Sequence, residues 1–264
     1  MRFHAIQHDV VPNDPYATST NVELLINQAA VKTGDFVVLP EMSLTGFSLN
    51  INTVSNGNSL AWGKSFAKEK QIWLQVGWAN RIDGRAKNCV SICDPNGEVI
   101  ATYEKVFTCN PFGENQIIDK GTELIIVEIE GQKICPLICY DLRFPELWRL
   151  ATQAGADIFT NSANWPKARI YSWSSLLIAR AIENQAQVIG CNRIGKDDVA
   201  NWGGCSAAIT EEGFLMAQAS EYDAECLSAE FNQSASIEWR QQFKALQDLD
   251  SKLLGNIDVR HIST

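Results

Sequence analysis

Apolar and polar residues follow one another along this chain in blocks that predict alternating strands and helices. Short apolar runs rich in β-branched residues predict strands, and apolar residues that recur every three or four positions predict helices. The predicted strands cover residues 2–9, Asp35–Leu39, Ile72–Ala79, Asn88–Cys93, Val99–Tyr103, Leu124–Ile129, Lys133–Ile138, Asp157–Thr160, Val188–Asn192, Cys205–Thr210, Phe214–Ala219 and Ala224–Phe231. The predicted helices run from Thr20 or Asn21 to Lys32, from Ser59 to Lys70, from Pro145 to Gln153, from Trp173 to Gln187 and from Glu238 to Leu254.

This order of elements predicts an α/β fold. Strand–helix alternation interrupted by hairpins favours mixed rather than purely parallel sheets, and so many strands suggest two sheets with helices outside. The segment Glu104–Gly121 has little periodicity and is predicted to be a long loop, a feature that is often functional in a compact domain. No repeat or linker-like composition break occurs, so residues 1–264 are predicted to form one domain, with a C-terminal helix and tail from about residue 232.

Composition excludes several classes of function. The chain has 264 residues, of which 45% are hydrophobic, and a net charge of −9, which suits one large globular domain. No run of lysine or arginine is present to neutralise phosphates, so nucleic-acid binding is not expected. No apolar run approaches membrane-spanning length, and MRFHAIQHDV is too short and polar for a signal peptide. We therefore expect a cytoplasmic protein that does not bind membranes.

The cysteines indicate free thiols rather than a framework of disulfides. The chain has eight of them, and without a secretory signal they should be reduced. None forms a C-x-x-C pair and none lies beside a histidine, so a structural zinc site is poorly supported and no metal is expected.

One cysteine stands where a nucleophile is expected. The apolar run Ile134–Ile138 predicts a buried strand, Cys139 follows it directly, and Pro145 and Glu146 open a helix. A strand, a thiol at its end, a sharp turn and a helix present a nucleophile above a sheet. The alternative is a buried structural cysteine, since free cysteines are often part of the core.

Chemically suited residues follow two further strands. Glu41 follows Asp35–Leu39, and Asn164 and Trp165 follow the strand that begins at Asp157. Ligand chemistry in α/β folds gathers beyond the carboxyl ends of strands. If these strands are parallel, their ends and Cys139 meet at one edge of the sheet.

A thiol needs a base before it attacks, and the chain offers few histidines. His4, His8 and His261 all lie near the termini. The base is therefore more readily a carboxylate, and Glu41 is the one presented at a strand end. Lys105 lies where it could stabilise an oxyanion together with the backbone N–H of Tyr140. Viewed singly, Glu41 and Lys105 are more readily explained as solvated surface residues.

These segments resemble a known family. LPEMSLTGF, YEKVF and ICYDLRFPELWR look like the glutamate, lysine and cysteine segments of the nitrilase (carbon–nitrogen hydrolase) superfamily. ANWPKAR, ARAIENQAQVIGCNR and CYDLRFPELWR resemble its ω-amidase branch, and the resemblance extends from residue 2 to about residue 250.

The resemblance implies a fold and a set of roles. The fold is a four-layer αββα sandwich that forms a homodimer. Glu41 is the general base, Lys105 stabilises the oxyanion, Cys139 is the nucleophile, and Glu114 helps to position the lysine. No metal or organic cofactor has a role. The loop after the lysine reads VFTC at residues 106–109, where the family more usually has His-Leu-Phe.

The resemblance also implies a class of substrate. ω-Amidases act on monoamides of short dicarboxylates, such as 2-oxoglutaramate and 2-oxosuccinamate, and release ammonia through a cysteine thioester. The distal carboxylate needs a cation, for which Arg143, Lys167 and Arg169 are candidates. Asn164 and Trp165 are expected to line the pocket. A salt bridge to Asp141 or Glu146 is an equal interpretation of Arg143.

Other functions remain open. The same triad could serve an N-carbamoyl amino-acid hydrolase or an aliphatic amidase, whose pocket charge would differ. A catalytically silent scaffold is a further hypothesis, although the three catalytic positions are intact. A redox-sensing thiol is weakly supported, because no resolving cysteine is obvious and Cys135 lies too far along the same strand for a disulfide.

Overall fold

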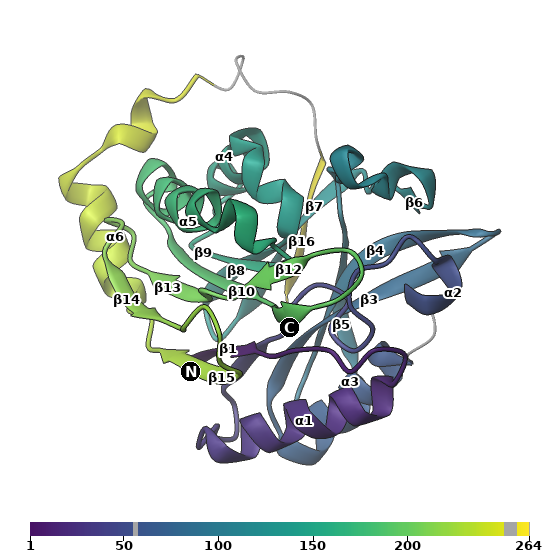
Figure 1. The fold of residues 1–264 in the computed structure, drawn as a ribbon. Helices are drawn as coiled ribbons and strands as arrows, with labels where there is room; N and C mark the ends of the chain where they lie inside the picture. Colours follow the sequence, from purple (N-terminus) through teal and green to yellow (C-terminus); the bar gives the residue numbers. More distant parts are fainter. Residues whose placement is uncertain (55–57, 251–257, 264) are drawn as a thin grey trace.

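Two sheets packed face to face form the centre of the protein (Figure 1). The computed structural model describes residues 1–54, 58–250 and 258–263. In spatial order, the first sheet contains β15 (Glu225–Ala229), β1 (Phe3–Gln7), β2 (Phe36–Val38), β3 (Trp73–Ile82), β4 (Arg85–Cys93) and β5 (Val99–Glu104), with β6 (Ile118–Asp119) paired to β4. The second contains β14 (Leu215–Gln218), β13 (Ala207–Ile209), β10 (Gln187–Asn192), β9 (Ile158–Ala163), β8 (Gln132–Ile138), β7 (Glu123–Ile129) and β16 (Asp258–Ser263). A small ribbon joins β11 (Ile194–Lys196) and β12 (Asn201–Gly203).

Helices cover the outer faces of both sheets (Figure 1). The first sheet is covered by α1 (Pro15–Gln28) and α3 (Ser59–Lys70), and the second by α4 (Pro145–Gln153) and α5 (Ile170–Asn184). Shorter helical elements are α2 (Ile51–Val54), α6 (Gln233–Gln242), η1 (Asn110–Phe112), η2 (Glu114–Gln116), η3 (Cys139–Arg143), η4 (Lys167–Arg169) and η5 (Ala245–Asp248). The predicted αββα sandwich of two mixed sheets is confirmed.

The strand β2 shows why an uninterrupted apolar run suits a strand between two layers. Phe36 and Val38 pack into the core between the sheets, whereas Val37 packs with the residues beneath α1 and α3. All three side chains are fully buried, because alternate residues of a strand point to opposite faces and both faces are covered here.

The predicted starting residue is wrong for two helices. We expected the first to start at Thr20 or Asn21, but α1 starts at Pro15, where the Asp14 carboxylate accepts the N–H of Ala17 at 2.9 Å. An aspartate that caps the helix and a proline at the first helical position are together a strong signal for the start of a helix. The helix expected from Trp173 instead begins at Ile170, directly after η4, and ends at Asn184 because Gln185 adopts a left-handed conformation with φ 47°.

The C-terminal prediction is also wrong in part. The expected helix from Glu238 to Leu254 is replaced by α6, which starts after its cap Asn232 and ends at Gln242, and by the short turn η5. Residues 251–257, which include the end of the predicted helix, lie outside the described residues. The strand β16 was not predicted; it pairs in parallel with β7 at the edge of the second sheet.

The long loop and several strand ends differ from the predictions as well. Residues 104–121 contain η1, η2 and the short strand β6. The strand β9 runs to Ala163 rather than Thr160, since it pairs in parallel with both β8 and β10 along its length. This extension carries Asn164 to the same end of the molecule as Cys139.

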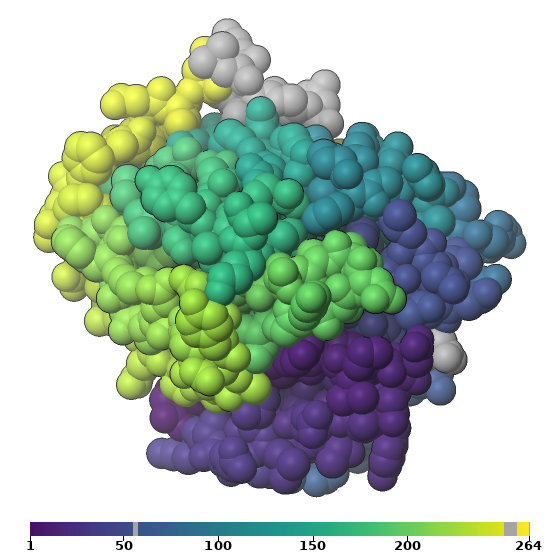
Figure 2. Space-filling view, in the orientation of Figure 1, coloured from purple at the N-terminus to yellow at the C-terminus, as the bar shows by residue number. Residues whose placement is uncertain are grey.

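The segment that follows β1 contacts the segment that follows β10 in the other sheet. Arg193 is buried and binds Asp9 at 3.0 Å, and the N–H of Ile194 donates to the carbonyl of His8. In Figure 2 the segment around residue 200 covers the surface beside the N-terminal helix. Within the described ranges, no helix has the length and apolarity needed to cross a bilayer.

Candidate active site

The thiol of Cys139 stands on a sharp turn between β8 and η3. Cys139 has φ 45°, a left-handed conformation that a residue with a Cβ rarely adopts. Asp141 supports the turn, because its Oδ2 accepts the N–H of Ile138 at 3.1 Å. The turn therefore directs the side chain of Cys139 away from the sheet, as the strand–turn–helix pattern predicts.

Asp141 also binds the strand that carries Lys105. Its carboxylate accepts the hydroxyl of Tyr103 and the N–H of Phe107, both at 2.9 Å. Burial raises the pKa of Asp141 to about 7, against the opposing effects of Lys105 and of the three donors. One carboxyl group thus joins the cysteine turn to the end of β5.

Glu41 is held by a second tight turn, at Pro40–Met42. The hydroxyl of Ser43 donates to the carbonyl of Pro40 at 2.7 Å and accepts the N–H of Gly77 at 2.8 Å. A Cβ at Gly77 would lie 2.5 Å from the Pro40 oxygen and 2.6 Å from the Met42 nitrogen. Only glycine therefore lets β3 approach this turn, and the sequence alone gave no sign of this requirement.

The three strand ends meet, but not at one edge of a single sheet as predicted. The strands β8 and β9 are parallel neighbours in the second sheet, whereas β2 belongs to the first. The ends come together because the sheets stack, and Ser162 on β9 donates to the carbonyl of Leu39 across the interface at 2.6 Å. The site lies between the layers, at one end of the sandwich.

A buried lysine lies between two carboxylates. The Nζ atom of Lys105 is 2.7 Å from Oε1 of Glu41 and 2.9 Å from Oε2 of Glu114. The exposed fraction of each of these three side chains is 1% or less. Burial alone would lower the pKa of Lys105, but the carboxylates of Glu114 and Glu41 raise it well above its ordinary value. The lysine is therefore a fixed cation.

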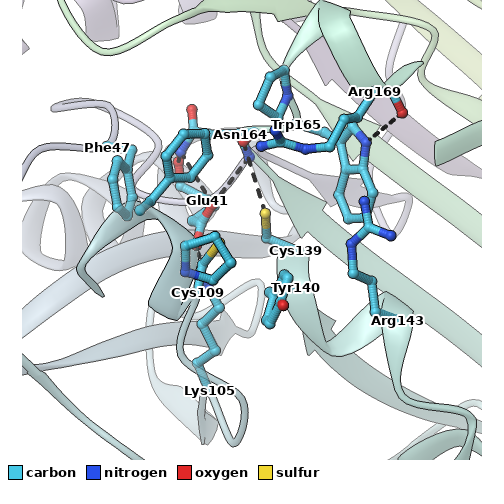
Figure 3. A pocket seen from close by; sticks show the side chains of 13 residues that line it. Glu41, Phe47, Lys105, Cys109, Cys139, Tyr140, Arg143, Asn164, Trp165 and Arg169 are labelled. Atoms are coloured by element: carbon cyan, nitrogen blue, oxygen red, sulfur yellow. Dashed lines mark hydrogen bonds and ion pairs between the residues drawn. The ribbon is translucent and has the colours of Figure 1, made fainter. Parts of the chain in front are cut away.

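The thiol of Cys139 and the second oxygen of Glu41 both contact Asn164. The Sγ atom of Cys139 lies 3.8 Å from the carbonyl oxygen of Asn164, whose N–H donates to Oε2 of Glu41 at 3.0 Å (Figure 3). Burial has the largest effect on the pKa of the Cys139 thiol and raises it well above its ordinary value. The Glu41 carboxylate raises this pKa further, whereas Lys105 lowers it. The resting side chain is therefore a protonated thiol, which would have to lose its proton before it could act as a nucleophile.

A cavity of about 240 Å³ opens above these residues. Predicted residues that line it are Glu41, Lys105, Cys139, Tyr140, Arg143, Asn164, Trp165 and Arg169. Sequence reasoning missed further lining residues, namely Phe47, Cys109, Pro111, Phe112 and Pro166. Those from residues 109–112 belong to the predicted long loop, where no periodic pattern distinguishes a lining residue from an exposed one.

Two predicted residues do not line the cavity. Glu114 is fully buried behind Lys105, where it also accepts the N–H of Cys109 at 2.6 Å. Lys167 lies outside it, 3.3 Å from Glu221 and with its ammonium over the ring of Tyr222.

Two arginines lie on one side of the cavity, on either side of Trp165 (Figure 3). The guanidinium carbon of Arg143 is 4.7 Å from the Trp165 ring centre, and that of Arg169 is 5.0 Å from the Phe112 ring centre. In the described part of the chain neither forms an ion pair, so the salt bridge from Arg143 to Asp141 or Glu146 is absent. By contrast, Arg180 binds Glu183 at 2.7 Å and the carbonyl of Leu142, as a structural pair.

The sequence also falls within a described family. The carbon-nitrogen hydrolase family model matches residues 4–241. The chain belongs to this family. That membership confirms the resemblance on which the predicted fold and roles depended.

Individual relatives agree with this assignment. The chain is 33% identical to the omega-amidase YafV of Yersinia enterocolitica over 96% of this chain and 98% of that protein. It is 33% identical to the 2-oxoglutaramate amidase of Bacillus subtilis over 94% of this chain and 97% of that protein. A CN-hydrolase superfamily protein of Xanthomonas campestris, solved with an arsenic adduct in its active site, superposes with a TM-score of 0.87 at 29% identity, covering 97% of this chain and 99% of that one.

Proposed function

We propose that this member of the carbon-nitrogen hydrolase family cleaves the terminal amide of short dicarboxylic acid monoamides, such as 2-oxoglutaramate and 2-oxosuccinamate, and releases ammonia. The observation that carries the proposal is one cavity that holds a thiol, a carboxylate–lysine pair and two guanidinium groups that form no ion pair with any described residue. The names of the omega-amidase and 2-oxoglutaramate amidase relatives support it.

The first step forms a tetrahedral intermediate. The Glu41 carboxylate takes the proton of Cys139, and the thiolate sulfur attacks the amide carbon. Because the pKa of this thiol is raised, the sulfur needs this base in order to react as a thiolate. A base adjacent to the thiol supplies what a histidine supplies in other cysteine hydrolases.

Lys105 stabilises the charge that develops on the carbonyl oxygen. The ammonium of Lys105 contacts Oε1 of Glu41 at 2.7 Å and both oxygens of Glu114, at 3.1 and 2.9 Å. The two oxygens of one carboxylate can share a single proton, so one of the three ammonium protons can turn to the oxyanion, together with the backbone N–H of Tyr140. Donors that are already fixed in place need no reorganisation when the charge appears, which is the source of their catalytic effect.

The intermediate then collapses and the enzyme is regenerated. Glu41 returns its proton to the amide nitrogen, the carbon–nitrogen bond breaks, and ammonia leaves a thioester on Cys139. Glu41 next takes a proton from water, the hydroxide attacks the thioester carbon, and the carbon–sulfur bond breaks. The acid is released and the proton restores the thiol. Each step uses one group as base and then as acid.

The arginines account for the class of substrate. A monoamide of a dicarboxylic acid carries a distal carboxylate, which a guanidinium binds through paired hydrogen bonds. Arg143 and Arg169 lie on the cavity side that Trp165 occupies, and neither has a carboxylate partner in the described residues. Lys167 is engaged with Glu221, so its role in binding this carboxylate is less well supported than theirs.

The arginine assignment is tested by comparing a charged and a neutral amide of equal length. We expect Arg143→Ala to raise KM for succinamate by about tenfold or more, since a charge-assisted hydrogen bond is lost, and to leave KM for butyramide within about twofold. Arg169→Ala is measured alongside, and Lys167→Ala is the control for a nearby surface cation. Steady-state ammonia release gives both constants.

Equal effects of Arg143→Ala on both amides would contradict the substrate assignment. Preferred cleavage of an N-carbamoyl amino acid or of a simple aliphatic amide by the wild-type protein would preserve the triad and replace the substrate class. If the wild-type protein cleaved none of the amides, the catalytically silent scaffold would be the remaining hypothesis.

We also propose that the protein works in the cytoplasm. All eight of its cysteines are free thiols, which is the state that a reducing compartment maintains. A thiol nucleophile is itself preserved by such a compartment.

A further inference from the structure

Asn88 is a buried residue of β4 that lies behind the charged cluster. It is fully buried, pairs with Ala79 on the neighbouring strand β3 and does not line the cavity. Its backbone carbonyl accepts the N–H of Lys105 at 2.8 Å. Its side-chain Nδ2 donates to Oε1 of Glu41 at 2.7 Å and to Oε1 of Glu114 at 2.8 Å. One residue therefore contacts all three members of the cluster.

The chemistry of the two acceptors fixes the orientation of this amide. Carboxylate oxygens accept hydrogen bonds, so the group that faces both of them must be the NH₂ of Asn88. The amide oxygen Oδ1 then points away, and it has no hydrogen-bond partner within the described residues although it is buried. A buried acceptor without a partner is unfavourable for stability, so the residue is better explained by what its donors do.

The two oxygens of Glu41 accept hydrogen bonds from different residues. Oε1 accepts Lys105 and Asn88 at 2.7 Å each, whereas Oε2 accepts the backbone N–H of Asn164 at 3.0 Å and its side-chain Nδ2 at 3.4 Å. The carbonyl of the same Asn164 lies 3.8 Å from the thiol. Oε1 therefore accepts the two shorter hydrogen bonds, and Oε2, on the side of Asn164, is the oxygen placed to take the proton of Cys139. The rotamer of Glu41 is thereby fixed in the orientation that the reaction needs.

We propose that Asn88 is a positioning residue that joins Glu41 to Glu114 by donating a hydrogen bond to each carboxylate beside Lys105, and that it directs Oε2 of Glu41 to Cys139. This inference rests on the proposed amidase function, in which Glu41 is the base.

The electrostatic part of the role follows from two like charges held close together. Glu41 and Glu114 share one cation, and the thiols of Cys139 and Cys109 are the other titratable groups that face Glu41. Hydrogen bonds donated to a carboxylate favour its ionised form.

The test replaces Asn88 by residues of similar size that lack its two donors. Asn88→Leu removes them, and Asn88→Asp keeps the shape but adds a third carboxylate. Asn161→Leu is the matched control, because Asn161 is also a fully buried strand asparagine and its side-chain amide has no partner in the described ranges. Two readouts are recorded against pH: steady-state ammonia release from succinamate, and alkylation of Cys139 by iodoacetamide, which needs no amidase substrate.

For both Asn88 variants we expect kcat at neutral pH to fall by about tenfold or more, because a charged acceptor loses a donor. KM should stay within about twofold, since Asn88 does not contact the cavity. The acidic limb of both pH profiles should move upward by about one pH unit, with the larger shift in Asn88→Asp. Asn161→Leu should leave the profiles unchanged.

Unchanged acidic limbs in both Asn88 variants would overturn the inference, as would a shift of equal size in Asn161→Leu. A rise in KM without a fall in kcat would also contradict it. A wild-type protein that is alkylated at Cys139 but cleaves no amide would contradict the proposed function, and the alkylation profiles would still decide the role of Asn88.

Discussion

At the scale of single residues, the buried lysine is the feature on which the chemistry depends most. Lys105 is held by two carboxylates that differ in position: Glu41 faces the cavity, and Glu114 is buried behind the lysine. The first is placed to exchange protons with a substrate, whereas the second contacts the lysine, Asn88 and the N–H of Cys109 but does not line the cavity. Their contributions are therefore separable by mutation.

Glu114→Gln keeps the shape of the side chain and removes its charge. We expect kcat to fall by about a hundredfold with KM little changed, because Lys105 loses a partner that fixes its position for the oxyanion. Glu104→Gln is the matched control, since Glu104 precedes Lys105 directly but is half-exposed and binds Lys87 at the surface. Steady-state ammonia release measures both variants, and a Glu114→Gln enzyme with wild-type kcat would contradict this role.

The site residues that could be identified from the sequence are those that follow a local sequence pattern. Cys139 and Glu41 each stand directly after an apolar run, and the histidine-poor composition favoured a carboxylate base. Asn88 and Gly77 gave no such signal, because their importance comes from contacts with segments more than ten residues away. Such contacts exist only in the folded chain.

At the scale of elements, Asp141 joins the cysteine turn to the end of β5. The pKa of this carboxyl is raised by burial to about 7 in the folded protein, whereas an aspartate in an unfolded chain titrates near about 4. Between these values the unfolded chain releases a proton that the folded protein keeps. The contribution of Asp141 to stability is therefore fully present below about pH 4 and is lost as the pH rises to about 7.

We expect the free energy of unfolding of the wild type, relative to Asp141→Asn, to fall by roughly 1 kcal/mol per pH unit over this interval and to level off above it. Urea unfolding of both proteins at several pH values measures the difference. A difference that does not fall over this interval would show that Asp141 is already ionised in the folded protein, held by its three donors.

Element boundaries were predicted where local signals decide them. α3 and α4 match the predicted ranges, and α4 begins at a proline that suits the first helical position. α6 ends early because contacts distant in sequence fix it: Arg240 binds Asp157 and the carbonyl of Gln185. The partner of β16 lies more than a hundred residues upstream, so the local sequence held no sign of the pairing.

At the scale of the whole molecule, the number of apolar strands predicted two sheets, but not which strands share them. The sequence placed Glu41 and Cys139 at strand ends, and the stacking of the sheets brings those ends together. The pattern of strands predicted two sheets with helices outside, and the resemblance to the family predicted the αββα sandwich. The site is therefore a product of packing between layers.

We propose that the chain forms a homodimer through the outer face of α5. Tyr171 and Ile182 on this helix are exposed by 84% and 52%, and Phe214, beside the turn that rests on Ile182, is exposed by 66%. Apolar side chains grouped in this way are typical of a protein interface. Sedimentation velocity should give about twice the 29.3 kDa mass of the chain.

Ile182→Asp should shift the protein toward the monomer, because a charge would be buried without a partner. Leu24→Asp is the control, since Leu24 is equally exposed, at 53%, but lies on α1 over the other sheet. A wild-type protein that stays monomeric at about 100 μM, far above the dissociation constant of a stable dimer, would contradict the proposal.

The central claim is that Cys139 carries the hydrolysis of a terminal amide. The measurement that tests it most directly is ammonia release from 2-oxoglutaramate by the wild-type protein and by Cys139→Ala, with Cys109→Ala as the control for a second thiol in the same cavity. We predict turnover by the wild type, turnover of the same order by Cys109→Ala, and a loss of at least about a thousandfold in Cys139→Ala. Turnover that survives in Cys139→Ala would contradict the account.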